Sequence, residues 1–275
     1  MNNKFIFIAC LFLSCHSAVK IEETAVNHFP VLEERITALP AKENFYIFLL
    51  AGQSNMAGRG FVQPADTISS THVLMLNKNN EWVYAKEPLH YYEHGRTGLD
   101  CGLSFGKELS RLYGRKITIG LVPCAIGGSS IEQWLGDSTY RGVTLYSNFL
   151  QRARAASQTG IIKGLLWHQG ESNAGVRSYK NYKENLQLFF DRIRKDINQH
   201  DLPVYAGELG SYLLKATNPN ADAVNNDLHQ LSTSYKNFHV ISTGDLTCKS
   251  DTIHFDSRSQ REMGKRFAKE VYRSR

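Results

Sequence analysis

Short apolar runs rich in β-branched residues recur along the chain from residue 45 onward, and each is too short for a typical helix. Between them lie longer segments in which apolar residues recur every three or four positions, as on one face of a helix. The short runs predict five strands, at Phe45–Ala51, Ile117–Cys124, Ile161–Trp167, Pro203–Glu208 and Phe238–Thr243. The longer segments predict helices at Leu103–Tyr113, Leu145–Gln158, Tyr179–Asn198 and Ala221–Tyr235, with a last helix after Ser257.

The regular alternation of strand and helix indicates the fold class. Parallel neighbours in a sheet need a crossover connection, and right-handed crossovers place helices on both faces of the sheet. We therefore expect an α/β fold, a three-layer α/β/α sandwich around a five-stranded parallel sheet, with ligands at the carboxyl ends of the strands. A length of 275 residues is compatible with one such domain.

The last predicted helix has a start signal of its own. Ser257 is followed three residues later by Gln260, which is a capping-box pattern, and apolar residues continue the helical stripe from Met263 to Val271. Residues 251–254 are therefore expected in the loop between the last strand and this helix.

The first residues differ from the rest. Lys4 precedes nine apolar residues, 5–13, which is too short for a bilayer-spanning helix of ~20 residues and predicts an export signal over residues 1–14. The run ends at Leu13-Ser14-Cys15, which resembles the lipobox of bacterial lipoproteins, with Cys15 as the lipid-bearing first mature residue. A secreted protein cut between Ser14 and Ala18 is the alternative. We expect an exported protein in the periplasm, at the cell surface or secreted, with residues 15–44 as a tether and entry segment and 45–275 as the folded domain.

Charge and composition narrow the possible partners. The apolar fraction of 42% is ordinary for a globular protein, and the net charge of +6 is mild. Lysines and arginines are interspersed with acids, as in residues 191–196, so they suit a solvated surface better than a phosphate-binding stripe. We expect no nucleic-acid partner, and membrane contact only through a lipid on Cys15.

Three cysteines remain once Cys10 and Cys15 are assigned to the leading segment: Cys101, Cys124 and Cys248. Export permits a disulfide among them, and the odd number leaves at least one thiol over. No two have the spacing of a zinc site, so no metal is predicted.

A small-residue turn directly after the first predicted strand carries a serine, in Gly52-Gln-Ser54-Asn-Met. A serine hydroxyl is a weak nucleophile and needs a positioned base, while a turn into a helix also offers free backbone N–H groups. Asp251 and His254, in the loop before the last helix, can supply the base and the carboxylate that orients it. An ordinary glycine-serine turn is the alternative interpretation.

Two further strand ends carry polar loops. In Ala125-Ile-Gly-Gly128-Ser the paired glycines allow a backbone N–H to approach a substrate oxygen, so Gly128 is a candidate for an oxyanion hole. In Trp167-His-Gln169-Gly-Glu171 the Gln169 amide could donate to the same oxyanion as a neutral group.

Taken together, segments 52–56, 125–129, 167–171 and 251–254 resemble the SGNH hydrolase superfamily, and within it the sialate O-acetylesterase and acetylxylan esterase branch. The match runs from about Phe45 to Ala268. The resemblance implies cofactor-free and metal-free hydrolysis of acetyl esters on a flavodoxin-like sheet. Gln169 stands where the wider superfamily has asparagine, a departure that this branch shares.

Carried over to this chain, the resemblance implies that Ser54 is the nucleophile and that Asp251 and His254 complete the triad. The Ser54 and Gly128 amides would form the oxyanion hole with Gln169. Glu171 would assist His254 as a second carboxylate, or would serve a structural hydrogen bond.

The predicted function is therefore removal of acetyl groups from a carbohydrate partner, either a sialate or an acetylated xylan. Arg96 could pair with a sialic carboxylate. The alternatives are an esterase or lipase of broader acyl specificity and a surface lipoprotein that binds glycan without hydrolysis. Candidate sugar contacts are Gln53, Asn55, Arg96, Trp134 and Asn173.

Overall fold

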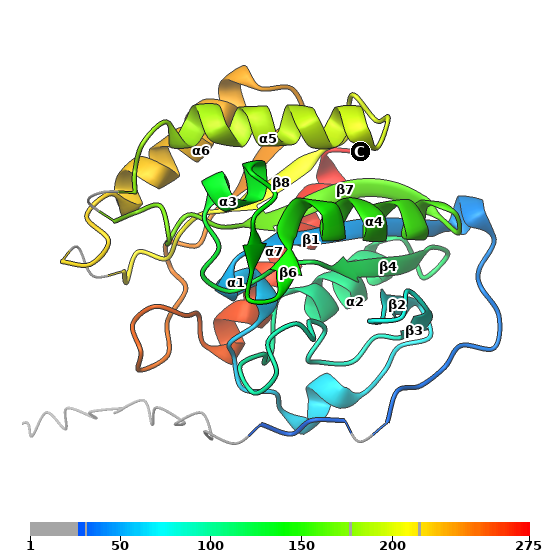
Figure 1. Cartoon of the computed structure of the whole chain (residues 1–275). Coiled ribbons are helices and arrows are strands. Elements are labelled where there is room, and N and C mark those ends of the chain that lie inside the picture. The colour runs from blue at the N-terminus through cyan, green and yellow to red at the C-terminus, as the bar shows by residue number, and fades with distance from the viewer. Residues whose placement is uncertain (1–26, 31, 176–177, 214–215) are drawn as a thin grey trace, which may run out of the picture.

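The computed structural model describes residues 27–30, 32–175, 178–213 and 216–275 (Figure 1). Its centre is a sheet of seven strands: β1 (Phe45–Gly52), β2 (Val73–Leu76), β3 (Trp82–Tyr84), β4 (Thr118–Pro123), β7 (Ile161–His168), β8 (Val204–Gly207) and β9 (Phe238–Ile241). The α-helices are α1 (Ser54–Ala57), α2 (Gly102–Leu112), α3 (Ile131–Leu135), α4 (Leu145–Ser157), α5 (Tyr182–Asp196), α6 (Ala221–Ser234) and α7 (Ser257–Arg273). A small hairpin consists of β5 (Thr139–Tyr140) and β6 (Val143–Thr144).

The strand order is β3-β2-β4-β1-β7-β8-β9. The five predicted strands lie side by side in the order 2-1-3-4-5 of a flavodoxin-like sheet, and all their pairings are parallel. The α/β class is thus confirmed.

The prediction of five strands is wrong, because β2 and β3 extend one edge of the sheet. They are only four and three residues long, and β3 runs antiparallel to β2. Strands of this length show too few residues for a periodicity to stand out.

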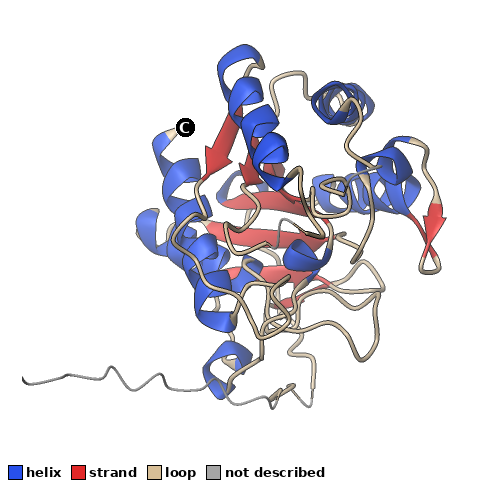
Figure 2. Cartoon of the chain, turned by 90° about the vertical axis from the view of Figure 1, so that its left-hand side faces the viewer, coloured by secondary structure: helices blue, strands red, loops and turns tan. Residues whose placement is uncertain are grey.

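Helices cover both faces of the sheet (Figure 2). On β1, Phe45, Ile47 and Leu49 pack in the core cluster that includes residues of α3 to α6, whereas Phe48 and Leu50 pack in the cluster with α2 and α7. Because both faces of the strand are covered, it is apolar almost throughout, which explains the continuous run in the sequence.

The described part of the segment before Phe45 lies along the sheet edge. The Glu34 carbonyl accepts a hydrogen bond from the Tyr84 N–H, and Arg35 forms a bridge with Val83. The predicted export signal and Cys15 lie outside the described residues. Of the helices that the structure describes, none combines the length and apolarity needed to cross a bilayer.

Of the three cysteines in the described part of the chain, no two form a disulfide. Cys101 and Cys124 are buried, and the Cys101 sulfur lies 3.8 Å from the Met56 sulfur. Burial raises the pKa of the Cys101 thiol well above its usual range, so this cysteine is an unreactive core residue.

The start of α7 differs from the prediction by one residue. Asp256 is the N-cap, and its side chain accepts a hydrogen bond from the Ser259 N–H, whereas Ser257 is already helical. Gln260 is buried and donates to the Asn55 carbonyl instead of closing a capping box. The predicted box is wrong because Asp256 is the stronger acceptor at the helix start and Gln260 is used in a tertiary contact.

Candidate active site

The carboxyl ends of β1, β4 and β7 meet the loop before α7. β1 and β7 come so close that a Cβ atom on Gly52 would lie 2.1 Å from the His168 carbonyl oxygen, and Gly52 has a φ of +136°. Only glycine fits there, and the chain then turns directly into α1. Ser54 is the first residue of that single turn of helix, just after the carboxyl end of the central strand β1.

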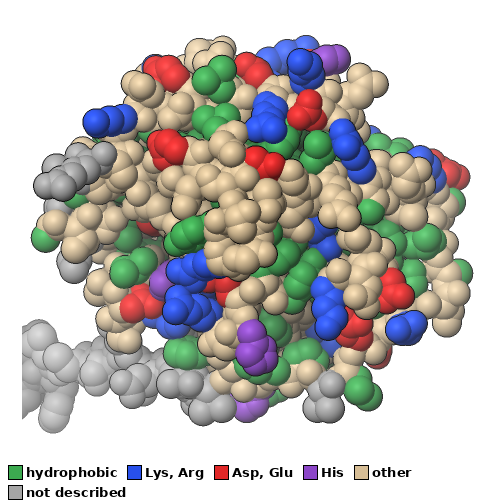
Figure 3. Space-filling model, viewed as in Figure 1, with side chains coloured by type: hydrophobic (Ala, Val, Ile, Leu, Met, Phe, Trp, Pro, Cys, Tyr) green, Lys and Arg blue, Asp and Glu red, His purple; other side chains and the backbone are tan. Residues whose placement is uncertain are grey.

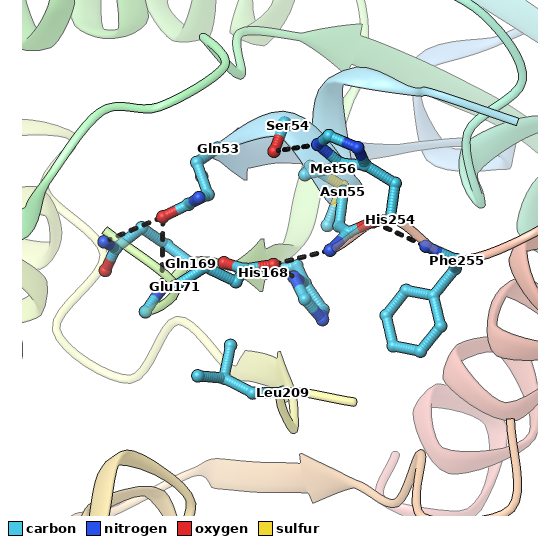
Figure 4. A network of polar contacts seen from close by, with 12 residues as sticks. Gln53, Ser54, Asn55, Met56, His168, Gln169, Glu171, Leu209, His254 and Phe255 are labelled. Atoms are coloured by element: carbon cyan, nitrogen blue, oxygen red, sulfur yellow. Dashed lines mark hydrogen bonds and ion pairs between the residues drawn. The ribbon is translucent and has the colours of Figure 1, made fainter. Parts of the chain in front are cut away.

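The structure brings the three predicted catalytic residues together. Figure 4 shows the Ser54 hydroxyl next to the His254 ring. The Ser54 hydroxyl lies 3.0 Å from Nε2 of His254, and Nδ1 of the same ring lies 2.9 Å from Oδ2 of Asp251. These are the contacts through which an imidazole takes a serine proton while a carboxylate fixes its tautomer.

Asp251 also shapes the loop that carries His254. Its Oδ1 accepts hydrogen bonds from the Ile253 and His254 N–H groups, each 2.9 Å long. Partial burial acts to raise the pKa of Asp251, but these two N–H groups and the imidazole lower it below the ordinary value. Thr252, between Asp251 and Ile253, has a φ of 57°, which is a strained conformation for a β-branched residue. The hydrogen bonds of Asp251 hold it in place.

Asn55 holds the His254 loop against the sheet. Its side chain accepts a hydrogen bond from the Phe255 N–H at 3.1 Å and donates to the Ile253 carbonyl at 3.3 Å, so it binds the backbone on both sides of His254. Its amide also donates to Oε1 of Glu171 at 2.5 Å. Glu171 thus reaches the His254 loop through Asn55, the contact expected of the structural role considered for it.

The loop after β4 carries Gly128, the predicted oxyanion-hole residue, and residues 125–129 are called the oxyanion loop below. Gly128 has a φ of +79°, and neither its N–H nor that of Ser54 donates to a protein acceptor among the described residues. The Gln169 side chain is fully buried, and its NH₂ group, with two hydrogens, has the Gln53, Ser129 and Asn173 oxygens within 3.2 Å. To donate to an oxyanion as well, Gln169 would have to release one of these acceptors. The Ser54 and Gly128 N–H groups are therefore the two donors available to an oxyanion.

Comparison with known proteins agrees with this geometry. Residues 44–273 match the family described as carbohydrate esterase, sialic acid-specific acetylesterase. The chain belongs to this carbohydrate esterase family. It is therefore an esterase, and the resemblance drawn from its four motifs is confirmed at the level of the family.

Several relatives of the esterase are known. It is 30% identical over 240 residues to a protein of Arabidopsis thaliana named a "probable carbohydrate esterase", covering 79% of this chain and 86% of the relative. The crystal structure of that plant protein aligns with a TM-score of 0.73 over 86% of this chain and 99% of the other, at 29% identity. NanS (TM-score 0.68, 18% identity, 86% of this chain and 100% of the other) has the same fold. A carbohydrate acetylesterase of Xanthomonas citri also has this fold (TM-score 0.59, 20% identity, 84% of this chain and 57% of the other).

An ion-pair cluster beside the oxyanion loop of the esterase was not predicted. Oε2 of Glu93 accepts hydrogen bonds from the Gly127 N–H and from Nη2 of Arg59, both 2.7 Å long, and Oε1 accepts from Nη1 of Arg141. Burial acts to raise the pKa of the Glu93 carboxyl, but the Arg59 guanidinium and the other donors lower it. Arg96, the arginine that the sequence indicated as a carboxylate partner, lies three residues from Glu93 and is exposed, whereas Glu93 is buried.

Four of the predicted sugar contacts are wrong, because their side chains are inaccessible. Gln53, Asn55, Trp134 and Asn173 are each at most 3% exposed. Their polar atoms bind neighbouring loops: Gln53 accepts from the Ser172 N–H, and Asn173 donates to the Glu132 carboxylate. Polar side chains at crowded strand ends are needed to form hydrogen bonds with buried backbone groups. In a sequence, such residues look the same as residues that bind a ligand.

Trp134 is a core residue of the esterase. Its ring centre lies 5.8 Å from those of Trp167 and Phe189, and its Nε1 donates to the Ser129 hydroxyl at 2.9 Å. We expect Trp134→Ala to lower the free energy of unfolding by about 3–5 kcal/mol, as measured by urea denaturation, with a smaller loss in Trp134→Phe. A raised KM with an unchanged free energy of unfolding would contradict this assignment and restore Trp134 as a sugar contact.

Within the described residues, no group of three histidine, cysteine, aspartate or glutamate side chains is arranged to hold a metal ion.

Proposed function

We propose that this esterase removes acetyl groups from a glycan through Ser54, His254 and Asp251. His254 Nε2 accepts the Ser54 proton while Oγ attacks the acetyl carbonyl, and the oxyanion is bound by the Ser54 and Gly128 N–H groups. The tetrahedral intermediate collapses as His254 returns the proton to the sugar oxygen, which leaves as an alcohol. A water molecule, deprotonated by His254, then attacks the acetyl-enzyme, and acetate departs with the serine hydroxyl restored.

The observation that carries the proposal is the Ser54–His254–Asp251 chain of contacts at 3.0 and 2.9 Å within a carbohydrate esterase family. A protein that only bound glycan would have no need of a nucleophile in hydrogen-bond contact with a base. The acetyl preference is supported by the family match.

A substrate panel tests this proposal. We expect acetate release from O-acetylated sialic acid or acetylated xylo-oligosaccharides, and hydrolysis of 4-nitrophenyl acetate with kcat/KM at least about tenfold above that of the octanoate, because added methylenes need space in the acyl site. Preference for the octanoate would favour the lipase alternative. Glycan binding without hydrolysis of any ester would favour the binding-protein alternative.

Export belongs to the same proposal, since a glycan-degrading esterase meets polymeric substrates outside the cytoplasm. The support is the sequence pattern over residues 1–14, and lipid on Cys15 remains the membrane-bound variant of the proposal.

A further inference from the structure

The tip of the β5–β6 hairpin carries an arginine in an unfavourable conformation. Arg141 and Gly142 connect the two strands with φ values of 50° and 79°, the signs of a type I′ turn. The first position of such a turn favours asparagine, aspartate or glycine, because other side chains are strained at positive φ. An arginine at this strained position is consistent with a use of its guanidinium where the hairpin places it.

That place is directly beside the oxyanion site. Arg141 Nη2 lies 3.4 Å, and the Tyr140 hydroxyl 3.1 Å, from the point where a Cβ atom of Gly128 would be. Its Nη1 donates to Glu93, which in turn binds the Gly127 N–H. The same carboxylate that braces the oxyanion loop therefore also fixes the position of Arg141.

The cluster keeps an excess of positive charge. Arg59 and Arg141 share the single carboxylate of Glu93, which leaves a net charge of 2 − 1 = +1, and the Lys249 ammonium lies against the Arg59 carbonyl at 2.7 Å. Figure 3 shows basic side chains next to a histidine on this face of the molecule, with acidic side chains beside them. The Arg59 and Glu93 side chains are 10% and 4% exposed, whereas that of Arg141 is 32% exposed and can meet a ligand.

We propose that Arg141 binds a carboxylate of the acetylated sugar, so that the preferred substrate is an acidic glycan. This inference rests on the proposed function. An acetyl carbonyl held at the Gly128 N–H leaves the sugar ring next to Arg141, whose planar guanidinium matches a carboxylate. With a neutral acetylated sugar, the guanidinium would have only the Glu93 carboxylate, which it already shares with Arg59. The carboxylate could belong to a sialic acid or to a hexuronic acid.

The test compares kcat/KM for O-acetylated sialic acid with that for its methyl ester, in which the carboxylate is masked, and for an O-acetylated galacturonate oligosaccharide with its methyl ester. For at least one pair we expect the wild type to prefer the free acid by about tenfold or more, mainly through KM. Arg141→Gln should reduce that preference to about one, and Arg141→Lys should keep part of it because the charge remains. Which pair responds identifies the source of the carboxylate.

Arg154→Gln is the matched control, because Arg154 is an exposed arginine on α4 outside the site, and it should keep the wild-type preference. Equal kcat/KM for acid and ester in the wild type for both pairs would overturn the inference without relying on any variant. So would a preference that Arg141→Gln retains while its thermal unfolding is unchanged, or one that is lost in Arg154→Gln. Failure to hydrolyse even 4-nitrophenyl acetate would instead count against the proposed function.

Discussion

Ser54→Ala is expected to lower kcat/KM for acetyl esters by about 10⁴-fold or more, because the acetyl group then has no oxygen to which it can be transferred. The remaining rate would reflect water acting in a site that still has the Gly128 N–H. The Ser54 hydroxyl's described partner is His254, so loss of one side-chain oxygen should leave the melting temperature nearly unchanged. Acetate release and thermal unfolding, measured on the same preparation, check both expectations.

Ser157→Ala is the control for that variant. Ser157 lies at the end of α4, and its hydroxyl donates to the Arg154 carbonyl, so it should retain full activity. Comparable activity in Ser54→Ala and Ser157→Ala would rule out Ser54 as the nucleophile.

Asp251→Asn is expected to lower kcat on the order of 10³-fold or more. The carboxylate accepts from Nδ1 of His254 and leaves Nε2 to accept the serine proton, whereas an asparagine amide can donate to Nδ1 and stabilise the wrong tautomer. Steady-state kinetics with 4-nitrophenyl acetate measures the loss. Asp245→Asn, at an exposed ion pair with Arg266, is the matched control and should retain activity.

A loss below about tenfold in Asp251→Asn would show that another group orients His254. Circular dichroism would confirm that the loop change has not unfolded the protein.

The lowered pKa of Asp251 predicts how the stability of the protein depends on pH. A carboxyl group whose pKa is lower in the folded than in the unfolded state stabilises the folded protein at pH values above its unfolded pKa. This contribution disappears as the pH falls through the folded pKa. Asp251→Asn should therefore flatten the loss of stability on acidification.

The fold was predictable where the chain is apolar over many residues. β1 and β7 have eight residues each and lie at the centre of the sheet, so both are buried on two faces and show as continuous runs. β2 and β3 depend on the sheet edge and on the segment around Arg35 for their pairing, and a local pattern does not contain such information.

The site was predictable where function depends on a local motif. Ser54 follows a glycine turn, and Asp251 and His254 are close in sequence, so both features are visible without coordinates. Arg141 and Glu93 are 48 residues apart, and only the folded hairpin brings them to the oxyanion loop. Trp134 was predicted as a sugar contact but is buried in the core. An aromatic residue close in sequence to a catalytic loop shows the same pattern whether it faces a sugar or the core.

The central claim is that Ser54 is the activated nucleophile of acetyl ester hydrolysis, and covalent labelling tests it most directly. Diethyl 4-nitrophenyl phosphate phosphorylates activated serines, and peptide mass spectrometry locates the label, while acetate release from an acetylated sugar is followed in the same samples. The account predicts one label per chain, on Ser54, with activity lost in proportion to the fraction labelled. A label on another residue, or acetate release that persists when Ser54 is fully labelled, would contradict it.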